Sequence, residues 1–168
     1  MLWAGKSAEQ ALADLPRHIV LRLSWMLGSA GENHLTHLLD QVMTGEPVQV
    51  YTRLRGAPTP YSDAARVTVG MIKQVLCGAE NWGVMHYCSA DACTHAELAD
   101  HVVRSLQQLD LLTQPPDLEQ IDQLPETEPA SAVLSCNRAR DGFGIQARSW
   151  RPSLMPMIKR WNRERVKP

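Results

Sequence analysis

The chain has 168 residues, of which 44% are hydrophobic and 21% are charged, so it can bury the core of one soluble domain. Its formal net charge of −1 gives no electrostatic basis for binding nucleic acid. No run reaches the roughly 20 apolar residues of a membrane-spanning helix, and the first residues lack a signal-peptide pattern, so we expect a cytoplasmic protein without a membrane anchor.

The spacing of apolar residues predicts helices that alternate with strands. Residues 18–25 and 82–88 are nearly continuous apolar runs, which are typical of strands covered on both faces in a parallel sheet. Helices are predicted over residues 3–15, 33–43, 63–76, 94–109, 137–143 and 150–161, and further short strands over residues 47–51 and 118–121. The predicted fold class is therefore α/β with right-handed crossovers.

Several predicted helix ends carry specific signals. Thr94 followed by Glu97 is a capping box at a helix start. The helix that begins near residue 137 should end at Gly142 or Gly144. Pro152 fits the first turn of the last helix, whereas Pro156 should kink that helix or mark its true start.

The stretch 55–65 predicts an ordered loop that leads into a helix. Two prolines and a glycine exclude regular structure up to Pro60, and Ser62 or Asp63 is a suitable N-cap. Backbone amides at a helix start favour an anion, but the Asp63 carboxylate would oppose one. The local sequence therefore assigns no phosphate site here.

The four cysteines are expected to be reduced thiols packed as small apolar residues. The spacing of His86, Cys88, Cys93 and His95 suggests a zinc site as an alternative. It lacks a C-x-x-C pair, and two of the four residues lie in a strand-like run. We therefore predict no metal site.

Polar side chains gather at predicted strand ends and loops, where ligands bind in open α/β sheets. This set consists of Arg22, Ser24, Trp25, Asn33, Arg55, Thr59 and Asp63. For any single member, capping, turn formation or packing is the alternative interpretation. No glycine-rich phosphate loop of the Gly-x-Gly-x-x-Gly kind is present in the sequence.

An ordered series of motifs carries a resemblance over nearly the whole chain. The series runs through Arg22, Leu23, Ser24, Trp25, Gly28 and Asn33, residues 55–59, Asp63, Ala64 and Ala65, and the tail residues 129–134, 143–145, Trp150, Arg151 and Leu154. It resembles the second half of extended short-chain dehydrogenase/reductases, and within them the dTDP-4-dehydrorhamnose reductases.

The resemblance implies the C-terminal part of a Rossmann-like parallel sheet plus the small substrate-binding domain of that family, interleaved over residues 1–168. It implies reduction of a 4-keto nucleotide sugar of the dTDP type with NADPH or NADH, as in dTDP-L-rhamnose biosynthesis. The family's N-terminal cofactor-binding half would precede residue 1, so we expect no nicotinamide binding by this chain alone.

The resemblance also implies roles for single residues. Trp25 would lie near the sugar, where it could stack on a sugar face. Asn33, Arg55 and Thr59 would lie near the nucleotide-sugar pocket, where Arg55 could pair with a phosphate. Asp63 would cap the helix behind the pocket.

Departures from the family's pattern concern catalysis and charge. The family's catalytic Tyr-x-x-x-Lys pair should fall at the N-terminus; if Lys6 is a remnant of the lysine, Leu2 stands in place of the tyrosine. No tyrosine precedes Tyr51. Glu128 stands where the family usually has arginine, and Ala132 replaces a serine, so a pyrophosphate would be repelled here.

Three hypotheses follow. The chain is the C-terminal part of a reductase-like protein that cannot transfer hydride alone, or it is a non-catalytic module that binds a nucleotide sugar, a protein partner or a second copy. The second type resembles the regulatory subunit of methionine adenosyltransferase. The third is a truncated reading frame, whose exposed strand edges would favour aggregation or dimerisation.

Overall fold

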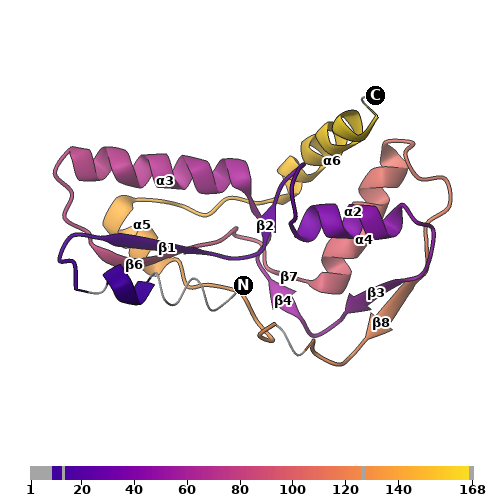
Figure 1. Cartoon of the computed structure of the whole chain (residues 1–168), viewed down its shortest axis with the longest axis horizontal. Coiled ribbons are helices and arrows are strands. Elements are labelled where there is room, and N and C mark those ends of the chain that lie inside the picture. The colour runs from indigo at the N-terminus through magenta and orange to yellow at the C-terminus, as the bar shows by residue number, and fades with distance from the viewer. Residues whose placement is uncertain (1–8, 13, 126–127, 167–168) are drawn as a thin grey trace.

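The strands form four separate two-stranded sheets in the computed structural model, which describes residues 9–12, 14–125 and 128–166 (Figure 1). Among these residues, three strand pairs are parallel and one is antiparallel. Helices lie between the strands along the chain, which confirms the predicted α/β class. Leu2 and Lys6 lie outside the described residues, so their predicted roles stay predictions.

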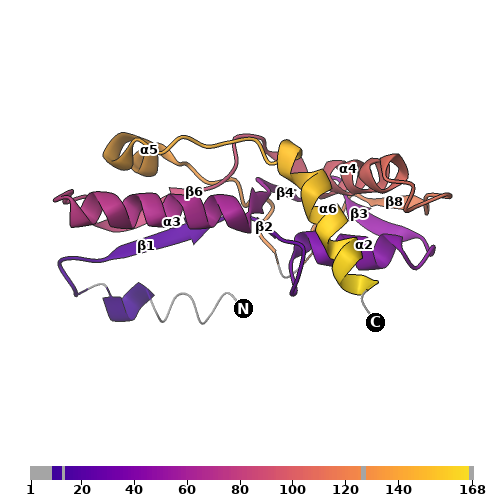
Figure 2. The ribbon, with the colours of Figure 1, turned by 90° about the horizontal axis from the view of Figure 1, so that it is seen from above.

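One end of the molecule, the first lobe, contains the longest parallel pair and two helices (Figure 2). Its elements are β1 (Ile19–Leu23), α3 (Tyr61–Leu76), β6 (Gly83–Tyr87) and α5 (Asn137–Phe143). Val67 of α3, Phe143 of α5 and Met85 of β6 meet in its core. No β1 residue is fully buried, because β6 is its one strand neighbour in the described part of the chain. This strand is less covered than its apolar sequence predicts.

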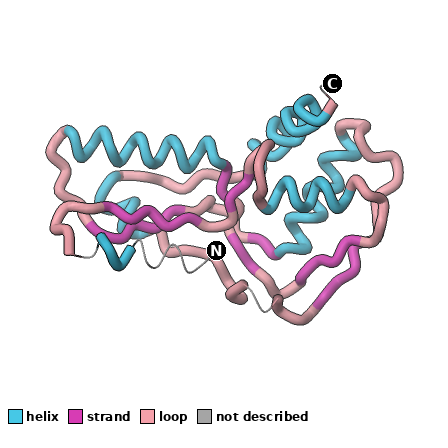
Figure 3. Tube along the Cα trace, in the orientation of Figure 1, coloured by secondary structure: helices cyan, strands magenta, loops and turns pink. Residues whose placement is uncertain are grey.

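The second lobe holds the larger core. Its elements are α2 (His34–Val42), β3 (Val48–Tyr51), α4 (His95–Gln108), β8 (Leu118–Ile121) and α6 (Arg151–Arg165). Leucines of α2 and α4 pack with Trp150, which immediately precedes α6, and with Ile158 of α6. Strand β8 pairs in parallel with β3, which confirms the short strand predicted at residues 118–121. A long loop after β8 leads back to the first lobe (Figure 3).

Two very short pairs lie where the lobes meet. Strand β2 (Met26–Leu27) pairs in parallel with β5 (Thr59–Pro60), and β4 (Arg55–Gly56) pairs antiparallel with β7 (Cys93–Thr94). The stretch 55–65, predicted to be irregular up to Pro60, therefore supplies two strands. Strands of two residues have no measurable periodicity, so the sequence pattern could not predict them.

The start of α3 corrects the predicted role of Asp63. The helix begins at Tyr61, and its N-cap is Pro60, which makes no side-chain capping bond. Asp63 lies inside the first turn, where its carboxylate forms an ion pair with Arg66 at 2.7 Å and accepts a hydrogen bond from the Tyr87 hydroxyl. Asp63 thus ties α3 to the end of β6 and does not cap the helix.

Other helix ends follow their sequence signals. The Thr94 and Glu97 capping box is present at the start of α4. Helix α5 ends at Gly144, which has a φ of 63°. Helix α6 begins at Arg151 and continues through Pro156, so this proline does not mark its start. No helix in the described ranges is long and apolar enough to cross a membrane.

The cysteines are all free thiols, but they are not all packed. Cys88 and Cys93 are buried and Cys136 is half-buried, whereas Cys77 is exposed, contrary to the prediction. The Cys88 and Cys136 sulfurs lie 3.6 Å apart. The described residues contain no group of three or more side chains placed to hold a metal ion.

Candidate functional site

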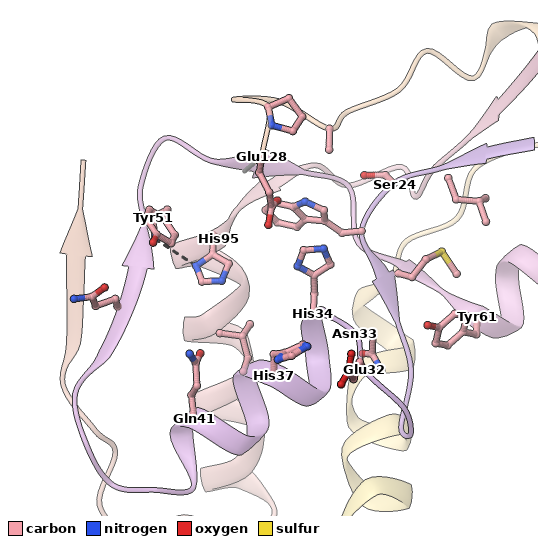
Figure 4. Close-up of a pocket in the computed structure, with 17 residues that line it drawn as sticks. Ser24, Glu32, Asn33, His34, His37, Gln41, Tyr51, Tyr61, His95 and Glu128 are labelled. Atoms are coloured by element: carbon pink, nitrogen blue, oxygen red, sulfur yellow. Dashed lines mark hydrogen bonds between the residues drawn. The ribbon is translucent and has the colours of Figure 1, made fainter. Parts of the chain in front are cut away.

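A cavity of about 800 Å³ opens beside α2, between the ends of β1 and β3, the start of α4 and the loop that follows β8 (Figure 4). Its volume lies in the range of small-molecule sites. Eleven of its lining residues are polar or carry a polar group on an aromatic ring: Ser24, Glu32, Asn33, His34, His37, Gln41, Gln49, Tyr51, Tyr61, His95 and Glu128. These residues come from segments far apart in the sequence, which the fold brings together.

Asn33 shapes the wall of this cavity at the start of α2. Its Oδ1 accepts hydrogen bonds from the backbone amides of Gly28 at 3.1 Å, Leu35 at 3.0 Å and Thr36 at 3.3 Å. Its Nδ2 donates to the carbonyls of residues 30 and 31. The side chain therefore caps α2 and anchors the preceding turn, and its hydrogen-bonding groups already have protein partners.

Trp25 also lines the cavity, but only 4% of its surface is exposed. Its ring lies 5.1 Å from the His34 ring and meets the His95 ring edge-on at 6.3 Å. Its indole N–H is buried and has no hydrogen-bond partner among the described residues. The position is compatible with the predicted place near a sugar, and the free donor is a feature that a ligand hydroxyl can satisfy.

Three histidines line one side of the cavity. His34 and His37 lie on one face of α2, and His95 opens α4. The Tyr51 backbone amide donates to Nδ1 of His95 at 3.3 Å, so neutral His95 carries its proton on Nε2. Burial lowers the pKa of His95 to about 4, with a smaller effect from His34. Burial also lowers the pKa of His34, against an opposing effect of the Glu128 carboxylate.

The charge of the cavity is therefore acidic at neutral pH. Glu32 and Glu128 are its two carboxylates, and none of the described residues that line it is a lysine or an arginine. In Figure 4, Glu128 lies over His34 from the loop side. Because His34 and His95 are uncharged near pH 7, they do not offset these acids.

Of the other residues in the predicted set, all but Ser24 lie outside the cavity lining. Arg55 is exposed on β4, and its backbone bonds to residues 130 and 132. Thr59 is fully buried, donates to the Ala57 carbonyl and accepts from the Ser89 amide. Arg22 forms an ion pair with Glu9. Ser24 does line the cavity, but its hydroxyl accepts from the Ala57 amide. Binding by Arg55 or Thr59 stays a prediction.

One feature of the sequence indicated this cavity but was not part of the predicted site. His34, His37 and Gln41 follow helical spacing on α2, opposite the buried face formed by Leu35, Leu38 and Leu39. This polar stripe was visible in the sequence. The contributions of Tyr51, His95 and Glu32 depend on tertiary packing and had no local signal.

Acid should weaken the fold through His95. Its folded pKa lies below the ordinary 6.5, so its contribution is fully present above pH 6.5 and is lost as pH falls toward 4. We expect wild-type chain to lose about 1–3 kcal/mol across this window relative to His95→Asn, after allowance for partial solvent screening. Urea unfolding at several pH values measures the difference. His37→Asn, at an exposed residue of the same cavity, should follow the wild type.

Comparison with known proteins finds a family match over most of the chain. The model of the RmlD substrate binding domain family matches residues 3–163. A dTDP-4-dehydrorhamnose reductase of Sinorhizobium fredii is 22% identical over 147 residues, which cover 85% of this chain and 50% of the relative. A dTDP-4-dehydrorhamnose reductase of Aggregatibacter actinomycetemcomitans is 24% identical over 159 residues, covering 89% and 54%.

A solved structure supports the same fold. The dTDP-4-dehydrorhamnose reductase of Bacillus anthracis, determined in complex with NADP, superposes with a TM-score of 0.68 at 19% identity. The match covers 92% of this chain and 51% of that structure. The chain thus spans about half the length of each of these relatives.

Proposed function

Because this chain belongs to the RmlD substrate binding domain family, we propose that it is a module that binds a nucleotide sugar of the dTDP type and does not transfer hydride by itself. The observation that carries the proposal is the cavity beside α2, which the predicted sugar neighbour Trp25 lines together with polar groups from five other segments. Its volume of about 800 Å³ is large enough for a sugar ring. The reaction that the complete relatives are named for, reduction of a dTDP-4-keto sugar, is the context in which we expect this binding to serve.

The sequence contains no Gly-x-Gly-x-x-Gly turn of the kind that holds a nicotinamide cofactor. Dinucleotide sites place a glycine-rich turn between a strand and the N-terminus of a helix. In the described part of the chain, the pair Gly142 and Gly144 instead closes the C-terminal end of α5. We therefore assign no step of hydride transfer to these residues.

Calorimetry tests the binding part of this proposal. We expect saturable binding of dTDP-glucose to the wild-type chain and strong weakening in Gln41→Trp, which fills the cavity from an exposed position of α2. Gln107→Trp, at an exposed position of α4 outside the cavity, is the matched control and should bind as the wild type does. Equal binding by all three chains would place the ligand elsewhere and contradict the proposal.

A separate assay tests the catalytic part. With NADPH and a dTDP-4-keto-6-deoxy sugar, the purified chain should show no loss of absorbance at the NADPH band above a blank without protein. It should also leave the fluorescence of NADPH unchanged. Turnover that scales with protein concentration would show that the chain is an enzyme by itself.

One observation favours a protein-binding role as the second candidate. Val69, Ile72 and Leu76 of α3 are exposed, Leu76 at 81%, and Ile72 and Leu76 line an apolar groove of about 390 Å³ between α3 and β1. Exposed apolar clusters of this kind mark interaction surfaces. Sedimentation velocity of the wild type and Leu76→Asp over a wide concentration range tests self-association. A dimer that Leu76→Asp disrupts supports it, and a monomer throughout argues against a homodimer.

A further inference from the structure

The cavity beside α2 lacks the groups that hold a diphosphate. Phosphate oxygens in protein sites are met by lysine, arginine or free backbone amides at a helix start. None of the described lining residues is a lysine or an arginine. The amides of Leu35 and Thr36 at the start of α2 are already bonded to the Asn33 side chain, so these two amides are not free to bind an anion.

The same cavity presents two carboxylates without counter-ions. Glu128 is half-buried and Glu32 is exposed, and neither forms an ion pair within the described ranges. His34 and His95 stay neutral near pH 7, because burial lowers the pKa of each ring. A diphosphate inside the cavity would therefore face net negative charge, which repels it.

The available polar groups suit hydroxyls instead. Carboxylates accept hydrogen bonds from hydroxyl groups, and the proton on Nε2 of neutral His95 can be donated. The buried indole N–H of Trp25 is a donor without a partner among the described residues. A sugar ring supplies several hydroxyls that both donate and accept, and it carries no charge.

Resting on the proposed function, we infer that the cavity receives the sugar ring of a nucleotide sugar and excludes its diphosphate, and that Glu128 sets this preference. Glu128 is the half-buried acid of the pair and lies on the 128–132 segment, which is held to β4 through the Arg55 backbone. This pairing places Glu128 at the edge of the cavity. The sugar gives the affinity, and the diphosphate stays toward solvent.

A charge reversal tests this inference with three chains and two probes. Calorimetry compares dTDP-glucose with dTDP for the wild type, Glu128→Arg and Glu46→Arg. Glu46 is exposed and lines no part of the cavity, so Glu46→Arg reproduces the change in net charge alone. The wild type should bind dTDP-glucose clearly more tightly than dTDP. Glu128→Arg should bind dTDP about tenfold more tightly than the wild type does, whereas Glu46→Arg should not.

Salt gives a second readout. Affinity of Glu128→Arg for dTDP should fall as salt rises, while wild-type affinity for dTDP-glucose should change little. Glu128→Gln, which keeps the size of the side chain, should strengthen dTDP binding by a smaller factor. If Glu128→Arg unfolds at a much lower temperature than the wild type, Glu128→Gln serves as the test variant in its place. Wild-type binding of dTDP as tight as that of dTDP-glucose, or an unchanged ratio in both Glu128 variants, would overturn the inference. No binding of dTDP-glucose by any chain would overturn the proposed function itself.

Discussion

Replacing Gly56 with alanine should destabilise the chain by about 3 kcal/mol or more, because the new methyl group has no space. A Cβ at residue 56 would lie 2.2 Å from the Trp25 ring, and that ring is buried with 4% exposure. His34 and His95 pack against the indole, so displacing the ring would break these contacts. The free energy of unfolding from denaturant titration, followed by tryptophan fluorescence, measures the loss.

Two other glycines serve as matched controls. Gly70 lies in α3 with no atom within 4 Å of an added Cβ, so Gly70→Ala should stabilise the helix by about 0.5–1 kcal/mol. At Gly28 the added Cβ would meet the Tyr61 ring, which is 47% exposed and can rotate away, so Gly28→Ala should cost less than Gly56→Ala. A Gly56→Ala chain as stable as the wild type would refute the predicted clash.

Trp150→Ala should cost about 3–5 kcal/mol, the usual loss for a buried aromatic ring. Trp150 is fully buried, and its indole N–H donates to the Asp91 carbonyl at 3.0 Å. The His101 ring meets it edge-on at 5.4 Å, and the Arg151 guanidinium lies 5.0 Å from its ring. The side chain therefore joins the start of α6 to α4 and to the loop after β6.

A graded series separates packing from hydrogen bonding at this position. Trp150→Phe keeps one six-membered ring but loses the bond to Asp91 and part of the buried volume, so it should cost about 2–3 kcal/mol. Trp82→Ala removes a half-buried tryptophan near β6 and should cost less than Trp150→Ala. Thermal melts by circular dichroism rank the three variants. Equal losses for Trp150→Phe and Trp150→Ala would assign the effect to the hydrogen bond instead of to packing.

Local signals in the sequence account for the helices and the longer strands. The capping box of Thr94 and Glu97 and the apolar stripe of α2 were sufficient to predict these two helices, because each signal lies within a short continuous stretch of sequence. The β4 and β5 strands were missed because they have two residues each and depend on partners elsewhere in the chain. Local order is readable from sequence, and pairing between distant segments is not.

The candidate site was predictable only in part, for the same reason. Trp25 and Asn33 were identified through the motif series, and both line the cavity. Asp63 is a residue type that often caps helices, so it was predicted as a cap. The fixed φ of Pro60 instead starts the helix earlier, at Tyr61. The Asp63 carboxylate accepts hydrogen bonds from Arg66 and Tyr87. The contribution of His95 to the cavity required knowing where α4 packs.

The two lobes have separate cores, and the chain visits each of them repeatedly. It passes from β1 to α2, returns to α3 and β6, goes back to α4 and β8, and ends with α5 in one lobe and α6 in the other. Neither core is encoded by a continuous stretch of residues. The gene therefore cannot be divided at any single point into two halves that each fold alone. A destabilising substitution in one lobe should lower the stability of the whole chain in a single unfolding transition.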